Sequence, residues 1–267
     1  METFKSAICQ IKPTYNKKHN IEKALSMMEK AADEGSNLII LPEMFFYPYE
    51  MNLLKDEADD DKSTIRDLCA FAKKRGIWVC SGSIAEKDGN HIYNTSYLIS
   101  NTGETVLKYS KSHLFDVNLP GLVVSESSLF KKGDGIAVAN TTFGTVAICI
   151  CYDIRFPEYI RKAALLGADI LIVPAAFNTV TGPAHWHITF RARAVDNQLY
   201  VLAASPAKNA ESKYHAYGHS MFINPWGEVL SEASDEETII YAEIDMKKVK
   251  EVRERLPLLM HRRVELY

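Results

Sequence analysis

Short apolar runs and longer amphipathic stretches take turns along this chain. Residues 21–34 repeat apolar side chains at helical spacing, and Gly35 ends the pattern. The run 37–42 is apolar on both sides, as expected of a strand buried on both faces. The same order of helix, glycine, strand and proline recurs at 156–174, which is typical of βαβ units whose helices cover a sheet.

The remaining pattern predicts a chain that mixes strands and helices without a linker. We predict further strands at 4–11, 77–84, 91–100, 104–110, 145–150, 199–205, 218–223, 228–233 and 238–245. Further helices are predicted at 63–75, 184–198 and 246–256. Turn signals at 88–90 and 101–103 indicate hairpins, and 113–134 is expected to be a long irregular loop, more often functional than idle. We therefore expect one α/β domain over 1–267, with a mixed sheet or two packed sheets.

Composition and charge narrow the class of protein. The 267 residues are 47% hydrophobic and 24% charged, the ordinary range for a soluble globular chain that can bury a core without staples. A net charge of −3 offers no broad basic surface, so we expect no nucleic-acid or membrane partner. Five mostly scattered cysteines favour free thiols in a reducing compartment. With no apolar run of ~18 residues and no secretory signal at the start, this predicts a cytoplasmic protein.

Three reactive side chains follow predicted strands, at the position where α/β proteins gather catalytic groups. Glu43 stands among apolar neighbours that would raise its pKa and suit a general base, although an exposed loop carboxylate is the alternative. Lys111 and Cys151, each taken alone, are more often a solvated charge and a structural thiol. Taken together, however, they provide what amide chemistry requires. A thiol with a pKa near 8.5 needs a base or a nearby cation to act as a nucleophile at neutral pH.

The motifs around these three side chains, LPEMFF, KYSKSHLFD and ICYDIRFPE, resemble the signatures of the nitrilase superfamily of carbon–nitrogen hydrolases in type and order. The resemblance covers nearly the whole chain. It implies an αββα sandwich, two mixed sheets flanked by helices, that pairs through its helices into a homodimer or a larger homo-oligomer. It also implies hydrolysis of a small-molecule amide with no metal and no organic cofactor.

The resemblance carries specific roles to specific residues. Cys151 would attack the carbonyl carbon, while Glu43 would take its proton and later activate the hydrolytic water. Lys111 and the backbone N–H of Tyr152 would stabilise the oxyanion of the tetrahedral intermediate. Glu126, in VSESSLF, matches a second family carboxylate that supports Lys111 and the substrate. Ammonia would leave, and a thioester would be hydrolysed.

Four stretches, HLFDVNLPG, FNTVTGPAHW, RARAVDNQLYVLAASPA and YGHSMFINPWGEVL, resemble the omega-amidase branch of this superfamily. That branch implies hydrolysis of the terminal amide of 2-oxoglutaramate or 2-oxosuccinamate to the 2-oxo acid and ammonia. The sister branch, deaminated-glutathione amidase, shares TGPAHW and YGHSM but usually differs where this chain reads HLFD, VDNQ and NPWGE. It stays an alternative, as do other aliphatic amidases and nitrilases.

A substrate carboxylate needs a cation or clustered donors, because burying it unpaired is costly. Arg155, four residues after Cys151, offers a cation, but the family pattern YDxRFPE contains this arginine whatever the substrate, which favours a structural role. Tyr49, Phe177 and Thr181 match positions near the family's pocket and are candidate lining residues.

Two pairs of histidines invite a zinc hypothesis. His185 and His187 would face different sides of a helix, and Gly218 interrupts the segment that holds His215 and His219. We therefore predict no metal site from these pairs.

Two further classes of function compete with a thiol amidase. A noncatalytic interaction protein with the same fold is disfavoured because Glu43, Lys111 and Cys151 are all present. A redox-sensing thiol pair would use Cys149 and Cys151, but their spacing is not the Cys-x-x-Cys pattern. The amidase is the leading prediction.

Overall fold

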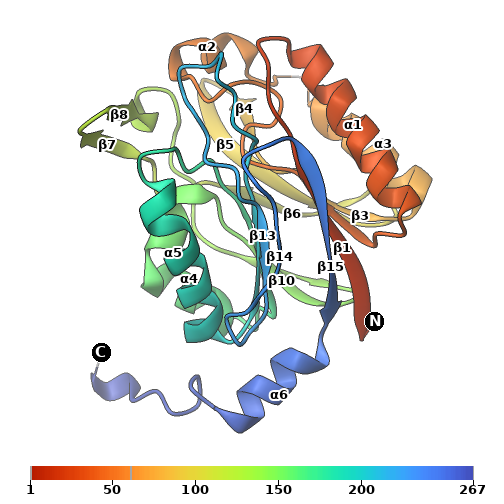
Figure 1. Cartoon of the computed structure of the whole chain (residues 1–267), viewed down its shortest axis with the longest axis vertical. Helices are drawn as coiled ribbons and strands as arrows, with labels where there is room; N and C mark the ends of the chain where they lie inside the picture. Colours follow the sequence, from red (N-terminus) through yellow and green to blue (C-terminus); the bar gives the residue numbers. More distant parts are fainter. Residues whose placement is uncertain (1, 61, 267) are drawn as a thin grey trace.

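Two β-sheets pack face to face, and helices cover the outer face of each (Figure 1). This arrangement comes from a computed structural model that describes residues 2–60 and 62–266. The four layers of helix, sheet, sheet and helix confirm the predicted αββα sandwich. Within the described residues, no helix has the length and apolarity needed to cross a membrane.

The first sheet has seven strands in the order β15-β1-β2-β3-β5-β4, with β6 paired to β5. Its strands are β1 (Thr3–Gln10), β2 (Leu38–Ile40), β3 (Trp78–Cys80), β4 (Ile84–Asp88), β5 (His91–Ile99), β6 (Thr105–Ser110) and β15 (Thr238–Asp245). The first three run parallel and the others antiparallel, so the sheet is mixed. Its outer helices are α1 (Lys17–Asp33) and α3 (Ser63–Arg75), which join the parallel strands as crossovers.

The second sheet has six strands in the order β14-β13-β12-β11-β10-β9. They are β9 (Val138–Thr141), β10 (Gly144–Ile148), β11 (Ile170–Pro174), β12 (Tyr200–Ala204), β13 (Met221–Ile223) and β14 (Val229–Glu232). Strands β10, β11 and β12 are parallel and are joined through α4 (Pro157–Leu165) and α5 (Gly182–Asn197), which cover this sheet. The order of helix, glycine, strand and proline that occurs twice in the sequence thus corresponds to one parallel crossover unit in each sheet.

Successive side chains of the central strands point to opposite faces of the sheet, and this divides the core into two clusters. In β1, Ile8 packs into the cluster between the two sheets, whereas Ala7 and Cys9 pack into the cluster beneath α1 and α3. In β2, Ile40 packs into the cluster between the sheets and Ile39 packs into the cluster beneath the helices. Because both faces of these strands are covered, their sequences read as apolar on both sides.

The strand predicted at 77–84 is wrong as one element, because it divides into β3 and β4 at Gly82. This glycine has φ +65°, and a Cβ there would lie 2.2 Å from the backbone oxygen of Pro42. The close approach of the chain after β2 therefore leaves no room for a side chain and bends the strand.

Other differences lie in short elements. The loop predicted at 113–134 contains the hairpin of β7 (Asp116–Leu119) and β8 (Leu122–Ser125) and a 3-10 turn at Glu126–Ser128. Sequence reasoning missed α2 (Met51–Glu57) and β9. Helix α1 begins at Lys17, before the predicted residue 21, because the side chain of Asn16 accepts a hydrogen bond from the His19 backbone and caps the helix.

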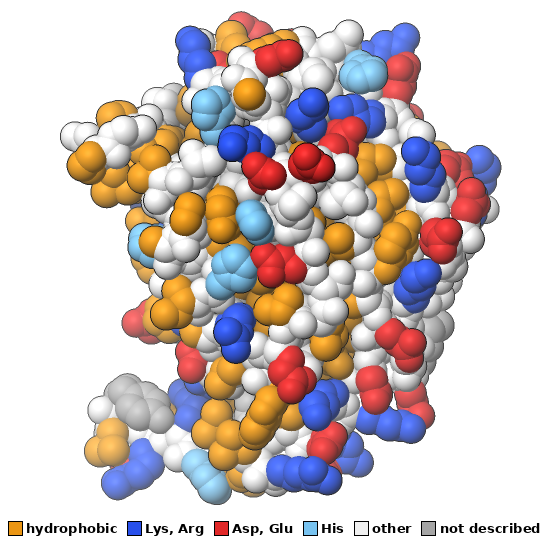
Figure 2. Space-filling model, in the orientation of Figure 1, with side chains coloured by type: hydrophobic (Ala, Val, Ile, Leu, Met, Phe, Trp, Pro, Cys, Tyr) orange, Lys and Arg blue, Asp and Glu red, His pale blue; other side chains and the backbone are white. Residues whose placement is uncertain are grey.

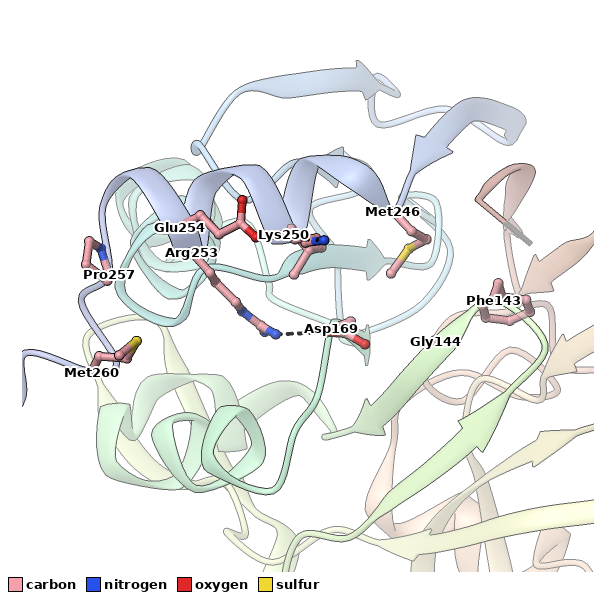
Figure 3. A pocket seen from close by; sticks show the side chains of 10 residues that line it. Phe143, Gly144, Asp169, Met246, Lys250, Arg253, Glu254, Pro257 and Met260 are labelled. Atoms are coloured by element: carbon pink, nitrogen blue, oxygen red, sulfur yellow. Dashed lines mark hydrogen bonds and ion pairs between the residues drawn. The ribbon is translucent and has the colours of Figure 1, made fainter.

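The last helix, α6 (Lys247–Arg255), forms one wall of a surface pocket, and the start of β10 lies on the other side (Figure 3). Nη1 of Arg253 lies 2.8 Å from Oδ1 of Asp169 across this pocket. Its described lining residues include no cysteine or histidine, so this concavity supplies neither a thiol nor an imidazole. Beyond α6 the chain extends away from the body of the molecule (Figure 1).

Candidate active site

The three reactive side chains predicted at strand ends meet where the two sheets come together. Glu43 follows β2, Lys111 follows β6, and Cys151 follows β10 of the other sheet. Nζ of Lys111 lies 3.0 Å from Oε1 of Glu43, and the Cys151 thiol is hydrogen-bonded to the Glu43 carboxylate. The base is therefore in contact with both the cation and the thiol.

Lys111 is clamped between two carboxylates. Its Nζ lies 2.9 Å from Oε1 of Glu126 as well as 3.0 Å from Glu43, and all three side chains are fully buried. Burial alone would lower the pKa of Lys111, but the carboxylates of Glu126 and Glu43 outweigh this effect and raise it well above the ordinary value. The alternative of a solvated surface lysine is therefore wrong, and the ammonium is a fixed positive charge.

The carboxylate of Glu43 is held by donors on both oxygens. Oε1 accepts a 2.8 Å hydrogen bond from Nδ2 of Asn94, and Oε2 accepts one of 2.8 Å from the backbone N–H of Ala176. Burial raises the pKa of Glu43 above its ordinary value, against the opposing attraction of Lys111. The alternative of an exposed loop carboxylate is wrong, and the group is a stronger base than a solvated glutamate.

Cys151 opens a 3-10 turn, Cys151–Arg155, directly after β10 and the two residues that follow it. Its φ of +48° is a left-handed conformation that residues other than glycine rarely adopt. The buried carboxylate of Asp153 anchors the turn, because it accepts hydrogen bonds from the backbone of Ile150 (3.0 Å), the hydroxyl of Tyr109 (2.6 Å) and the backbone of His113 (2.8 Å). These contacts hold the thiol beside Glu43.

The thiol of Cys151 rests in its protonated form. Burial raises its pKa well above the ordinary value, and the negative charge of Glu43 adds to this while Lys111 opposes it. Attack on a substrate therefore requires a base to remove the proton, and Glu43 is the base in contact. Cys149 is also buried with a raised pKa, and all five cysteines are free.

The four candidate pocket residues do not form one group. The hydroxyl of Tyr49 donates to the Glu126 carboxylate and so joins the cluster of Glu43, Lys111 and Cys151. The guanidinium carbon of Arg155 lies 4.4 Å from the centre of the Phe177 ring. Thr181 is buried just before α5, and its backbone N–H donates to Oδ1 of an asparagine three residues earlier at 3.0 Å.

Arg155 is a half-buried cation beside the thiol. Burial lowers its pKa, and the groups that act electrostatically on it include Cys151 and Tyr152. Its Nη1 faces Nδ1 of His185 at 3.1 Å, and within 2–60 and 62–266 no carboxylate forms an ion pair with it. The guanidinium is therefore available to an anion in a way that a purely structural arginine would not be.

Two residues of the site were missed by sequence reasoning. Asn94 lies inside β5, and a buried asparagine in a strand interior is itself a signal, because strands disfavour this residue. Tyr214 lies in a loop, donates its hydroxyl to the backbone oxygen of Ala176 and packs against Tyr49 with ring centres 4.8 Å apart. Nothing in its local sequence distinguishes it from other loop tyrosines.

A surface pocket lies next to this cluster and touches it through Tyr49 and Tyr214. Tyr49 and Tyr214 line it together with residues of α2 and of the β7–β8 hairpin, which projects from the molecule in Figure 1. Lys55 and Lys213 also line this opening. Glu50 lines the same pocket, so its lysines leave one positive charge in excess, which favours the approach of an anionic small molecule.

A four-layer sandwich with a buried Glu, Lys and Cys at the junction of its sheets defines a class of thiol-dependent hydrolases. The chain belongs to the carbon-nitrogen hydrolase family, which matches residues 5–254. This bears out the resemblance to the nitrilase superfamily and makes the protein a hydrolase.

Particular relatives are similar over the whole chain. Omega-amidase NIT2 of Mus musculus is 40% identical over 269 residues, covering 100% of this chain and 98% of that protein. Omega-amidase NIT2 of Homo sapiens is 39% identical with the same coverage. Among solved structures, Saccharomyces cerevisiae Nit3, a member of branch 10 of the nitrilase superfamily, is 37% identical with a TM-score of 0.90, covering 98% of this chain and 97% of that chain.

Proposed function

We propose that this protein is an omega-amidase that hydrolyses the terminal amide of small 2-oxo dicarboxylic acid monoamides. Its substrates would be 2-oxoglutaramate and 2-oxosuccinamate, and its products the 2-oxo dicarboxylic acid and ammonia. The observation that carries this proposal is the buried contact among Glu43, Lys111 and Cys151. The similarity to proteins named omega-amidase supports the choice of substrate.

The first half of the reaction forms a thioester. Glu43 takes the proton of the Cys151 thiol while the sulfur attacks the amide carbon, and the carbonyl electrons move onto oxygen. Lys111 and the backbone N–H of Tyr152 stabilise that oxyanion. As the carbonyl re-forms, the C–N bond breaks, and protonated Glu43 gives its proton to the nitrogen, which leaves as ammonia.

The second half hydrolyses the thioester. Glu43, again a carboxylate, removes a proton from a water molecule as the water oxygen attacks the thioester carbon. The C–S bond then breaks, the carboxylic acid leaves, and the thiolate of Cys151 recovers a proton from Glu43. Glu126 and Tyr49 take no proton in this scheme; they hold Lys111 in place.

Substrate recognition would rest on Arg155. Its guanidinium forms no ion pair with a described carboxylate and can form two parallel hydrogen bonds with the substrate carboxylate. Phe177, stacked on that guanidinium, would limit its movement and pack against the substrate's methylene groups. Thr181 would complete the pocket wall.

Ammonia release from 2-oxoglutaramate, measured beside deaminated glutathione with Cys151→Ala as the blank, tests the proposal. Turnover of 2-oxoglutaramate alone is the expected result. Preference for deaminated glutathione would keep the same reaction and assign the protein to the deaminated-glutathione amidase branch. Silence on every amide and nitrile, with the fold intact by circular dichroism, would favour a noncatalytic protein instead.

We further propose that residues 1–267 form one domain that assembles as a homodimer in the cytoplasm. The outer faces of α4 and α5 expose apolar side chains, among them Leu165, Ile188 (70% exposed) and Val195, and apolar side chains surface over these helices in Figure 2. Pairing two copies through these helices would bury them. Ile188→Asp is expected to convert the dimer to a monomer by light scattering, whereas an unchanged mass would exclude this face.

A further inference from the structure

Three metal-ligating side chains from separate elements meet at the surface. They are His187 on α5, His219 just before β13, and Glu232 at the end of β14. Their ligand atoms all lie within 4.8 Å of one another. Nε2 of His187 is 2.7 Å from Oε1 of Glu232, and Nδ1 of His219 is 3.0 Å from the same oxygen. None of the three has a part in the proposed hydrolysis, and histidine and acidic side chains lie together on the face shown in Figure 2.

The imidazole of His219 is held in place by its surroundings. Its backbone adopts φ +58°, which is uncommon for a residue with a side chain. Its carbonyl accepts a 2.7 Å hydrogen bond from the indole of Trp186, and its N–H donates to the backbone oxygen of Ser234 at 3.0 Å. The ring stacks on Tyr217 with centres 4.2 Å apart. An unfavourable backbone fixed by several contacts directs this side chain toward Glu232.

Glu232 has the environment of a ligand instead of that of a surface ion pair. Its side-chain partners are the two histidines, and within 2–60 and 62–266 no lysine or arginine forms a salt bridge with it. Two imidazole nitrogens and one carboxylate oxygen form a donor set that zinc sites use, with water at the fourth position. Tetrahedral bonds of about 2.0–2.1 Å place ligand atoms about 3.3 Å apart. The two nitrogen–oxygen separations observed, 2.7 and 3.0 Å, are hydrogen-bond distances and are shorter than this value, so the ligand atoms would move slightly apart as an ion replaces the protons between them.

We propose that His187, His219 and Glu232 bind one divalent transition-metal ion, of the class that prefers imidazole and carboxylate ligands, and that the ion ties α5 to the β13–β14 hairpin. The sequence suggested pairing each histidine with its neighbour in the chain. The fold instead takes one histidine from each pair and brings both to a carboxylate from a third element, a combination that the sequence-based expectation of no metal site did not consider. Held between three elements, the ion acts as a structural cross-link and leaves amide hydrolysis to the buried cluster.

Equilibrium dialysis of the full chain against Zn²⁺ tests the site. The protein carries Cys151→Ala, so that the catalytic thiol cannot bind the metal, and is first stripped with a chelator. We expect one Zn²⁺ per chain, with affinity reduced at least about tenfold by either Glu232→Gln or His187→Gln. His261→Gln, which removes an exposed histidine outside the cluster, is the matched control and should bind as the parent does.

Two further readouts separate a built site from adventitious binding. Zn²⁺ should raise the melting temperature of the parent and of His261→Gln but not that of the ligand variants. Co²⁺ in place of Zn²⁺ should give the visible absorption of a four-coordinate ion in the parent and in His261→Gln but not in the ligand variants. Binding of equal strength in the parent and both ligand variants, or no binding by the parent in the micromolar range, would overturn the proposal. Circular dichroism of each variant confirms that a loss of binding is not a loss of fold.

Discussion

The side-chain amide of Asn94 donates a 2.8 Å hydrogen bond to Oε1 of Glu43, the same oxygen that faces Lys111. Both residues are fully buried; Asn94 lies in β5, and Glu43 follows β2 of the same sheet. The amide therefore fixes the carboxylate at the angle from which it meets the thiol. A base that must first accept and later return a proton requires such fixed placement.

Replacement of Asn94 should slow the chemical step. In Asn94→Ala we expect kcat to fall about 10–100-fold, the value of a hydrogen bond to a charged group, with little change in KM. Steady-state ammonia release measures both constants. Asn140→Ala, at an exposed asparagine of β9, serves as the control. An unchanged kcat would show that Glu43 keeps its position without the amide.

Replacement of the proposed nucleophile should cause the largest loss of activity. Cys151→Ala should lower kcat at least about 10³-fold, because no other side chain can form the thioester. Mass spectrometry of the wild-type protein mixed with substrate and quenched in acid should show an acyl adduct on the peptide that contains this residue. Cys149→Ala is the matched control: it should weaken packing in the core yet retain the adduct. An adduct elsewhere would contradict the assignment.

The pH dependence follows from the raised pKa of Glu43. Only the carboxylate form can take the thiol proton, so kcat/KM should rise as Glu43 ionises, with a midpoint above the ordinary value of 4.5. The same shift has a consequence for stability. The folded chain holds this proton more tightly than the unfolded chain, so the contribution of Glu43 to the free energy of unfolding is greatest at low pH and falls as pH rises from the unfolded to the folded pKa.

Both effects are tested by Glu43→Gln. Activity should be lost at all pH values, and the decline in unfolding free energy attributed to this group should disappear from denaturant titrations run across the acidic range. An acidic limb at or below the midpoint of a solvated carboxyl would show that burial does not control this group.

Removal of Lys111 should cost both catalysis and stability. Lys111→Met leaves two buried carboxylates facing each other, so we expect a destabilisation of about 3–5 kcal/mol in urea titrations. kcat should fall about 10²–10³-fold through loss of oxyanion stabilisation. Adding Glu126→Gln should restore part of the stability and none of the activity. Lys18→Met breaks an exposed pair with Glu22 and should change neither quantity measurably.

Arg155 predicts a specificity effect. In Arg155→Ala the KM for 2-oxoglutaramate should rise about 10–100-fold, as expected for loss of hydrogen bonds to a charged group. A small neutral amide, which lacks the distal carboxylate, should be turned over at nearly the parental kcat/KM. An equal loss on both substrates would assign Arg155 to the structure of the turn that carries Cys151.

The sequence could predict the candidate cluster because each member follows a predicted strand and stands in a motif that resembles a family signature. Glu43 and Lys111 follow strands of the first sheet and Cys151 follows a strand of the second, and the fold brings these strand ends together. Sequence reasoning missed Asn94 and Tyr214 because the role of Asn94 arises from pairing across the sheet and that of Tyr214 from a loop that packs against it. Such contacts join residues far apart in the chain and leave little local pattern.

The same limit explains the errors in the fold. Gly82 divides a predicted strand because the backbone at Pro42 approaches it, a contact that no window of neighbouring residues contains. Helix α2 spans only seven residues, too few for its periodicity to stand out. His187 and His219 were compared with their sequence neighbours, whereas the fold sets each beside Glu232.

The left-handed backbone at Cys151 also restricts which nucleophile this site can accept. A β-branched side chain is a severe misfit at φ +48°, whereas an unbranched Cβ is tolerated at moderate strain. Serine could occupy the position without disturbing the turn, but threonine, a competent nucleophile in other hydrolases, could not. The backbone conformation at position 151 thus limits the nucleophile to an unbranched side chain, whatever the chemical reactivity of the alternatives.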